Sequence, residues 1–564
     1  MRTIAFLALA FAAACKAGVG GAETTPVGPA PGGIYPPRDL LTRRPLTRPE
    51  KTSFTETSRH ADVMLFLDSL KASNSSRYLS VGTLGRTSQG KDIPMVIMSR
   101  PIVRTAAEAK RLNRPIVYLQ GNIHGGEVEG KEALLALLRD LSSDQYLNVM
   151  DSLVIVAVPI YNADGNDALG PQERNRTEQN GPALIGQRPN GQGLDLNRDY
   201  IKAEAPETRA SIEFFRAWDP DVFVDLHTTD GSYHGYALTW APPLNPASFF
   251  SGPFTRDTIL PAVRSFLRDR EHIETFPYGN FASQDSVDRG WFTYDHRPRF
   301  GVNYYGLRGR VAILSEAYSH DTFRDRIIST YSFVSELLSF IAANHEDFVD
   351  LGRDADRKTT AFASTRNASP PIAIRSRLTR TPRVDEMRIE EVLKTGDSVL
   401  TEPGLNKGER RTGKILKSRV PIYDRFEPVL MQTLPYAWVI PGEQAALIEP
   451  LRRNGLFIER ASAAEHVRGE TFLVDSVIAE RQFQGHAPVR LIGRWRSDSV
   501  AVDPGAYIVR AAQPLAILAL YLLEPQSDDG LTTWNFLDAW IRPGAPYPVV
   551  RLLAPPTAPL APAR

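Results

Sequence analysis

The sequence predicts an α/β domain with a mixed, largely parallel sheet flanked by helices, followed by a smaller, mostly β C-terminal domain. From about residue 55, apolar runs of strand length alternate with segments of helical periodicity, a pattern typical of parallel sheets covered by helices. Beyond residue 382 the apolar runs are short and are separated by Gly and Pro, which favours strands joined by turns.

Six segments define the expected α/β domain. Strands are predicted at 115–120, 153–158, 222–226 and 311–314, and the run 153–158 is continuously apolar, as in strands buried on both faces. Helices are predicted at 128–141, where leucines share one side, and from Pro206 to Trp218, where proline stands at a tolerated early position.

Composition divides the chain of 564 residues into six parts. They are a signal peptide (1–22), a tether (23–54), the α/β domain (55–350), a linker (351–382), an accessory β-rich domain (383–545) and a disordered Pro/Ala-rich tail (546–564).

The N-terminus has the features of an export signal. Arg2 precedes an apolar stretch at 4–14 that is too short to span a bilayer, and no other run approaches about 18 apolar residues, so no membrane span is expected. The single cysteine, Cys15, ends this stretch and resembles the lipidated cysteine of bacterial lipoproteins; the alternative is cleavage near Ala22. Either way, we expect a periplasmic or extracellular protein without disulfides, anchored by lipid in the first case.

The formal net charge of +1 argues against nucleic acid as the main partner, because the chain has no excess of positive charge.

Three short segments indicate one catalytic metal site: His124-Gly125-Gly126-Glu127, His227 and Glu316. Two His and one Glu form a common catalytic zinc site that leaves a coordination position open for water. All three segments lie at the C-terminal ends of predicted strands, where sites form in open α/β sheets. Alone, a His-x-x-Glu match in a chain with 10 His is expected about once by chance, and the alternative is a surface loop.

Over about residues 55–345 the chain resembles the zinc carboxypeptidase (carboxypeptidase A-like) superfamily. His124 and Glu127 match its first two zinc ligands and His227 matches the third, while Glu316 matches its catalytic glutamate. The segments 193–200 (GLDLNRDY) and 206–208 (PET) match its carboxylate-recognition segment and the following helix. The resemblance implies one Zn²⁺ per chain and an enzyme that hydrolyses C-terminal peptide bonds.

Further roles follow from this resemblance. Glu316 would act as general base towards the zinc-activated water, and Arg176 would stabilise the oxyanion, with Arg174 as a competing candidate. Asp195 would orient a zinc-bound histidine from the second coordination shell.

Substrate contacts are expected from three residues. Asn197 and Arg198 would bind the substrate carboxylate, since a guanidinium fork matches carboxylate geometry. Among the tyrosines that precede Glu316, we select Tyr304 over Tyr294 and Tyr305 as the substrate-contacting one.

Several functions are compatible with these motifs. The leading hypothesis is an exported metallocarboxypeptidase acting on peptides, and a close variant acts on cell-wall peptide stems (muropeptides). The alternatives are an aspartoacylase-like deacylase of N-acyl amino acids and a zinc-bearing binding module without catalysis. The segment 206–208, the pair Asn197–Arg198 and the C-terminal extension argue against the deacylase, and the presence of Glu316 argues against the inactive module.

Overall fold

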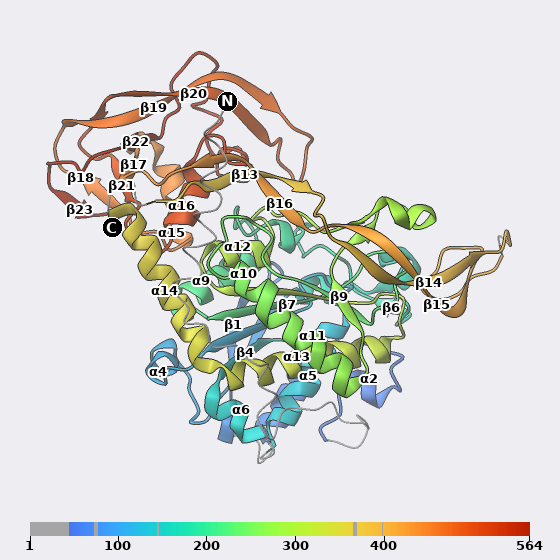
Figure 1. The fold of residues 1–564 in the computed structure, drawn as a ribbon. Helices are drawn as coiled ribbons and strands as arrows, with labels where there is room; N and C mark the ends of the chain where they lie inside the picture. The colour runs from blue at the N-terminus through green and yellow to red at the C-terminus, as the bar shows by residue number, and fades with distance from the viewer. Residues whose placement is uncertain (1–43, 73–76, 144–145, 365–368, 398, 564) are drawn as a thin grey trace.

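The structure is a computed structural model that describes residues 44–563 apart from 73–76, 144–145, 365–368 and 398 (Figure 1). The predicted signal peptide, Cys15 and residues 23–43 of the predicted tether lie outside the described residues. The rest of the predicted tether contains the short helix α2 (Arg48–Lys51), which Thr47 caps at its N-terminus.

A central eight-stranded sheet confirms the predicted mixed α/β fold. In spatial order its strands are β1 (Leu79–Arg86), β2 (Asp92–Met98), β4 (Val154–Val158), β3 (Ile116–Gly121), β7 (Val222–Thr228), β12 (Val311–Ala317), β8 (Leu238–Ala241) and β9 (Thr275–Pro277). The inner strands β4, β3, β7 and β12 pair in parallel, whereas β1, β2 and β8 each pair in antiparallel fashion with a neighbour. The four strands predicted from apolar runs are therefore the parallel centre of this sheet.

The two faces of the sheet belong to different hydrophobic cores. Val117 and Leu119 of β3 lie in the core formed with α5 (Glu129–Leu141) and α13 (Phe323–Ala343), whereas Tyr118 lies in the opposite core. That opposite core contains residues of α9 (Pro206–Trp218) and α12 (Gly301–Leu307). The alternation follows from the two-residue period of a strand, which sends successive side chains to opposite faces.

Other helices complete the first part of the chain. They include α3 (His60–Ala72), α4 (Ala106–Arg111), α6 (Leu147–Ser152), α7 (Ala163–Asp167), α8 (Gln172–Asn175), α10 (Gly252–Phe254) and α11 (Leu260–Phe266). Among the described residues no single helix is long and apolar enough to cross a membrane. The bent helix pair Phe323–Ala343 and His345–Phe362 reaches that length and apolar composition only when its two helices are taken together.

A seven-stranded antiparallel sheet forms most of the C-terminal region and confirms its mostly β character (Figure 1). Its strands in spatial order are β20 (Val489–Val502), β19 (Glu465–Ala479), β22 (Val550–Leu552), β17 (Ala437–Ile440), β21 (Tyr507–Arg510), β18 (Glu459–Ala461) and β23 (Leu560–Pro562). The helices α15 (Ile448–Arg453) and α16 (Ala516–Leu523) accompany it. Every residue of α16 is buried, and α16 belongs to the same hydrophobic core as α9 and α12.

Long strands connect the C-terminal region to the α/β part. The strands β13 (Ile372–Thr379) and β16 (Arg425–Gln432) pair with each other, and β14 (Val384–Lys394) pairs with β15 (Glu409–Tyr423). β15 also pairs with β11 (Trp291–Phe292), which itself pairs with β10 (Asn280–Phe281). A segment of the α/β part is thus built into a sheet with C-terminal strands.

Two segments differ from the sequence prediction. Helix α14 (His345–Ser364) occupies the first part of the predicted linker, where Asp356 pairs with the buried Arg310 and so ties the helix to the α/β part. The predicted disordered tail contains β22 and β23, which pair with β17 and β18. Proline and alanine lowered the apparent strand tendency of the tail, but neighbouring strands supply its backbone partners: β22 lies between β19 and β17, and β23 pairs with β18 at the edge of the sheet.

Candidate metal centre

A tight turn between β3 and α5 presents His124 and Glu127. Asn122 opens the turn in the left-handed region with φ 62°, and its Nδ2 donates to the carbonyl oxygens of His124, Gly125 and Glu127 at 3.0–3.3 Å. A Cβ on Gly125 would lie 2.2 Å from the carbonyl carbon of Gly165, so the turn needs glycine at this position. The turn therefore depends on residues that the His-x-x-Glu spacing alone does not include.

Three strands that lie side by side in the sheet bring the predicted residues together. His124 follows β3, His227 lies on β7 and Glu316 lies on β12, in the order in which these strands neighbour one another. Glu316 is directly opposite His227 in the parallel register.

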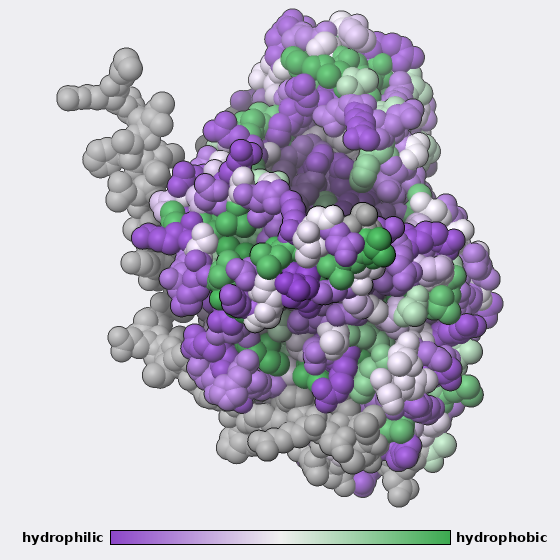
Figure 2. Space-filling model, turned by 90° about the vertical axis from the view of Figure 1, so that its right-hand side faces the viewer, coloured by the Kyte–Doolittle hydropathy of each residue, from purple (hydrophilic) through white to green (hydrophobic). Residues whose placement is uncertain are grey.

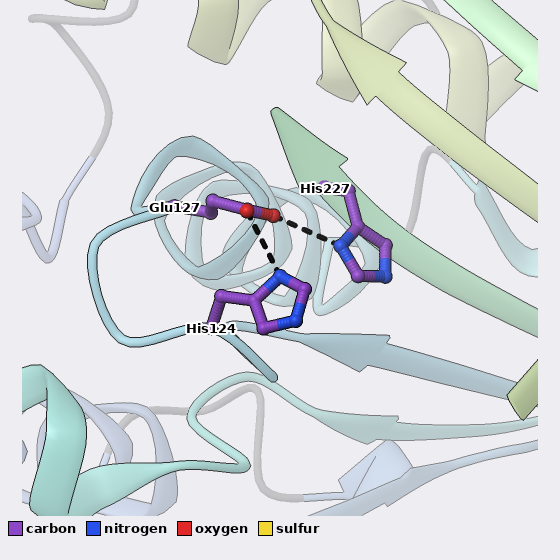
Figure 3. Close-up of side chains that lie close together, drawn as sticks. All are labelled: His124, Glu127 and His227. Carbon is purple, nitrogen blue, oxygen red and sulfur yellow. Dashed lines mark hydrogen bonds and ion pairs between the residues drawn. The ribbon is translucent and has the colours of Figure 1, made fainter. Parts of the chain in front are cut away.

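The ligand atoms converge on the Glu127 carboxylate (Figure 3). His124 Nδ1 lies 2.8 Å from Glu127 Oε1, and His227 Nδ1 lies 2.9 Å from Glu127 Oε2. The three side chains are 2–3% exposed, and their donor atoms all lie within 4.8 Å of one another. Two imidazoles and a carboxylate at this separation form a donor set that fits Zn²⁺.

An aspartate lies behind each histidine. Asp195 Oδ1 is 3.1 Å from His124 Nε2, and Asp225 Oδ2 is 3.0 Å from His227 Nε2. Because each Nε2 faces a carboxylate, each ring presents Nδ1 to the centre of the cluster, an arrangement that fixes ring orientation in metal sites. Asp195 has the position predicted for it. Asp225 was not among the predicted site residues, although its place two residues before His227 on the same strand face was a usable signal.

The charges at the site shift several pKa values. Burial favours a neutral Glu127, but the neighbouring His124 and Arg176 outweigh burial and hold the pKa of the Glu127 carboxyl well below its usual range. Burial likewise opposes a charged His227, but the Asp225 and Glu127 carboxylates raise the pKa of that imidazole well above its usual value. The cluster thus favours the ionised form of Glu127 and the protonated form of His227.

Glu316 has the opposite tendency. Burial raises the pKa of its carboxyl well above the ordinary value, and the negative charge of Glu127 adds to the rise, while His227 opposes it. Glu316 is 7% exposed at the end of β12, so it is a buried acid next to the cluster with a strong affinity for a proton.

Two arginine side chains lie close to the Glu127 carboxylate, and they differ in solvent exposure. Arg176 is buried: its Nη1 donates to Glu127 Oε1 at 2.7 Å, and its Nη2 donates to the carbonyl oxygens of Thr228 and Thr229. The Arg188 side chain is 37% exposed, and its Nη1 lies 3.5 Å from Glu127 Oε1. Arg188 Nε donates to Asp195 Oδ2 at 2.9 Å.

Arg188 was missed by the sequence analysis and is better placed than Arg176 to reach a substrate, since Arg176 is buried and held by three oxygens. Arg174, the other predicted candidate, is exposed and donates to the neighbouring Asn175. The segment around Arg188 had no distinctive residue pattern beyond its proximity to 193–200.

Asn197 and Arg198 lie beside the cluster as predicted. Asn197 Nδ2 is 3.4 Å from His227 Nε2, and its Oδ1 accepts from the backbone N–H of Gly301 at 2.9 Å. Arg198 is half-buried, and its guanidinium stacks over the Phe300 ring at 4.0 Å from the centroid. The ring fixes the plane of the guanidinium, and its Nη1 donates to the backbone carbonyl oxygen of Asn197 at 2.8 Å.

The selection of Tyr304 as a substrate contact is not supported by its position. Tyr304 is 0% exposed in α12, and its hydroxyl donates to Asn454 of the C-terminal region. Tyr294 is only half-buried, its hydroxyl has no partner among the described residues, and its ring packs against Phe300 at 5.3 Å. Tyr304 is inaccessible because α12 directs its tyrosine side chains into the core. The sequence analysis did not predict a helix at this position, so it could not indicate this burial.

Comparison with known proteins identifies relatives of one kind. Residues 63–248 match the family model described as zinc carboxypeptidase. Carboxypeptidase 2 of Trichophyton rubrum is 23% identical over 495 residues, covering 83% of this chain and 81% of that protein. Carboxypeptidase Z of Mus musculus is 32% identical over 136 residues, covering 23% of this chain and 19% of that protein.

Among solved structures, a metallo-carboxypeptidase from Pseudomonas aeruginosa in complex with (2-guanidinoethylmercapto)succinic acid is 17% identical. The match has a TM-score of 0.37 and covers 52% of this chain and 70% of that one.

Proposed function

We propose that this chain, a metallocarboxypeptidase by its similarity to the zinc carboxypeptidase family over residues 63–248, is an exported enzyme that removes C-terminal residues from peptides, with Glu316 as general base. The observation that carries the proposal is the convergence of His124, Glu127 and His227, with Glu316 directly opposite His227 on the next strand.

We propose that His124, Glu127 and His227 hold one zinc ion. When bound, zinc lowers the pKa of a coordinated water towards neutrality and polarises the carbonyl of the scissile bond. Asp195 and Asp225 keep the two imidazole rings oriented through Nε2.

Glu316 handles the proton. Its carboxylate takes the proton from the water as the water oxygen bonds to the carbonyl carbon, and it then delivers that proton to the amine nitrogen as the C–N bond breaks. The burial that raises its pKa supports this role, because a base must hold the proton long enough to donate it.

Two arginines contact the substrate in this proposal. Arg188 donates to the oxygen that becomes negative during attack, and we prefer it over Arg176 because it is partly exposed. Arg198, together with Asn197, binds the terminal carboxylate, which explains selection for the end of a chain.

Export is proposed from residues 1–22, and lipidation of Cys15 would hold the enzyme at a membrane surface. The purified 23–564 protein lacks that segment and is therefore suited to solution measurements.

The test compares this protein with its Glu316→Gln and Glu443→Gln variants, the latter at an exposed position. We expect one zinc per chain in all three, with release of C-terminal amino acids from a peptide mixture lost only in Glu316→Gln. Zinc binding without release by the parent would contradict the peptidase proposal, and the same samples offered cell-wall stem peptides or N-acyl amino acids would then identify the substrate class.

A further inference from the structure

The loop that joins β19 to β20, residues 480–488, reaches the candidate metal centre from the C-terminal region; we call it the tip loop. Gln484 and Gly485 turn the chain with φ values of 51° and 77°. Gln484 Oε1 accepts a hydrogen bond from the backbone N–H of Asp195 at 3.0 Å, across a separation of 289 residues.

The Asp195 carboxylate contacts three residues of the candidate site. Its Oδ1 faces His124 Nε2 at 3.1 Å, and its Oδ2 accepts from Arg188 Nε at 2.9 Å. Oδ1 also accepts from the backbone N–H of Asn197 at 3.0 Å. A contact that fixes the backbone of Asp195 therefore fixes a metal ligand, the exposed arginine and a substrate-binding residue at once.

The tip loop is anchored on both sides of Gln484. On one side, the Arg299 guanidinium lies over the rings of Phe483 and Trp534, 5.4 Å and 4.6 Å from their centroids. On the other side, His486 Nε2 lies 2.9 Å from Glu204 Oε1. These contacts keep the loop in place without the Gln484 bond, so replacing Gln484 need not displace the loop.

The base of the tip loop faces a cavity shared by the two parts of the molecule. Glu480 and Arg490 line this cavity of about 420 Å³ together with Tyr294 and Asp528. Tyr294 packs on Phe300, over which Arg198 stacks, so the cavity adjoins the residues proposed to bind the terminal carboxylate. The surface between the C-terminal sheet and the α/β part is also hollowed and mainly hydrophilic in side view (Figure 2).

We propose that the tip loop is a component of the active site, in which Gln484 is a positioning residue for Asp195 and the loop base forms one wall of the substrate cleft. The part that concerns substrate rests on the proposed function; the part that concerns zinc does not. The C-terminal region would then complete the metal centre rather than act as a separate binding module.

The test uses Gln484→Met, which removes the acceptor at nearly constant size, and Gln482→Met, the same change at an exposed position two residues away. For the purified 23–564 protein, we expect Gln484→Met to raise the zinc dissociation constant by about threefold to tenfold, less than direct loss of an outer-shell partner. Competition with a chelator measures this constant without any need for activity. Gln482→Met should match the parent, and both variants should keep the parent's Tm.

Activity supplies a second readout. We expect kcat of Gln484→Met to fall at unchanged Tm, since His124 and Arg188 are held less firmly, while KM changes little. Equal zinc constants and equal kcat for the two variants would overturn the inference, although the parent would still be an active zinc enzyme. If the parent itself bound zinc without releasing residues, the proposed function would fail, and the zinc constants would still decide the role of Gln484.

Discussion

At the residue scale, exposure separates the two arginines that reach Glu127. Arg176 is buried among fixed carbonyl and carboxylate oxygens, so it neutralises and holds Glu127. Arg188 has an exposed edge and so can offer donors to a substrate. Two arginines close to one carboxylate thus differ in burial, and this difference is the basis for the two roles that we propose for them.

We therefore expect Arg188→Met to lower kcat by about 10²–10³-fold, the usual effect of losing one oxyanion donor, with little change in Tm. Arg176→Met should instead lower Tm strongly, because it removes the buried guanidinium that pairs with the buried Glu127, at a cost of about 3–5 kcal/mol. Steady-state kinetics and thermal unfolding of both variants separate the roles. A larger loss of kcat in a stable Arg176→Met protein would return the oxyanion role to Arg176.

A second prediction concerns Asp221, which immediately precedes β7, at the opposite end of that strand from His227. Burial raises the pKa of its carboxyl to about 7, although Oδ2 accepts from the backbone N–H of Ile116 at 2.8 Å. This folded pKa is above that of an unfolded Asp, about 3.9, so the folded state binds the proton more tightly. The stabilisation is complete below about pH 4 and is lost as pH rises through about 7.

Asp221→Asn keeps an acceptor and removes the titration. Its Tm relative to the parent should therefore rise between pH 5 and pH 8, by about 2 °C or more. Asp503→Asn, at an exposed position, is the control and should show no such trend. A Tm difference that stays constant with pH would show that Asp221 does not titrate in this range.

At the element scale, the turn between β3 and α5 decides whether two ligands can share one site. The turn begins where the central strand β3 ends. Every residue of α5, which follows the turn, is buried, so the packing around α5 resists the shift that a wider turn would need. Close packing around Gly125 leaves no room for a side chain, because the atoms that a Cβ would meet are backbone atoms rather than mobile side chains. The backbone atoms concerned are the carbonyl carbon of Gly165 and the nitrogen of Asn166, which would lie 2.2 Å and 2.4 Å from a Cβ on Gly125.

 

Gly125→Ala should accordingly displace the turn, abolish tight zinc binding and lower Tm. Gly82→Ala is the matched control, since the nearest atom to its added Cβ is the flexible Met95 side chain at 3.8 Å. We expect the control to stay within about 1 kcal/mol of the parent in stability and to bind zinc normally. Zinc titration and thermal unfolding measure both effects, and normal zinc binding by Gly125→Ala would show that the turn can relax.

At the scale of the whole molecule, the C-terminal region and the α/β part share one hydrophobic core. The buried helix α16 lies in the same core as α9 and α12. Polar contacts cross the same boundary: Arg299 pairs with Asp529 at 2.7 Å, and Asn245 Nδ2 donates to the Tyr521 hydroxyl at 3.0 Å. A boundary of this kind is closer to a domain interior than to a flexible domain contact.

We therefore expect the fragment 44–364 to fail to fold on its own, because it would expose the apolar surface that α16 and its neighbours cover. The 44–563 protein, which keeps both parts, is the control and should unfold in one transition. Circular dichroism and thermal unfolding provide the measurement. A fragment that melts cooperatively and binds zinc would contradict the shared core.

The sequence by itself predicted the α/β class, the central strands and four residues that the fold brings to one place. Strand periodicity and short motifs are local properties, and parallel strands bring their C-terminal ends to one edge of the sheet without further information. For this reason His124, Glu127, His227 and Glu316 could be selected before any contact was known.

Only the tertiary structure decided which arginine is exposed, that Tyr304 is buried, that α14 is helical where a linker was expected, and that the tip loop meets Asp195. These features depend on burial and on contacts between segments far apart in the chain, such as the 289 residues between Gln484 and Asp195. Exposure is a property of the packed molecule, so no local pattern around Arg176, Arg188 or Tyr304 could have revealed it.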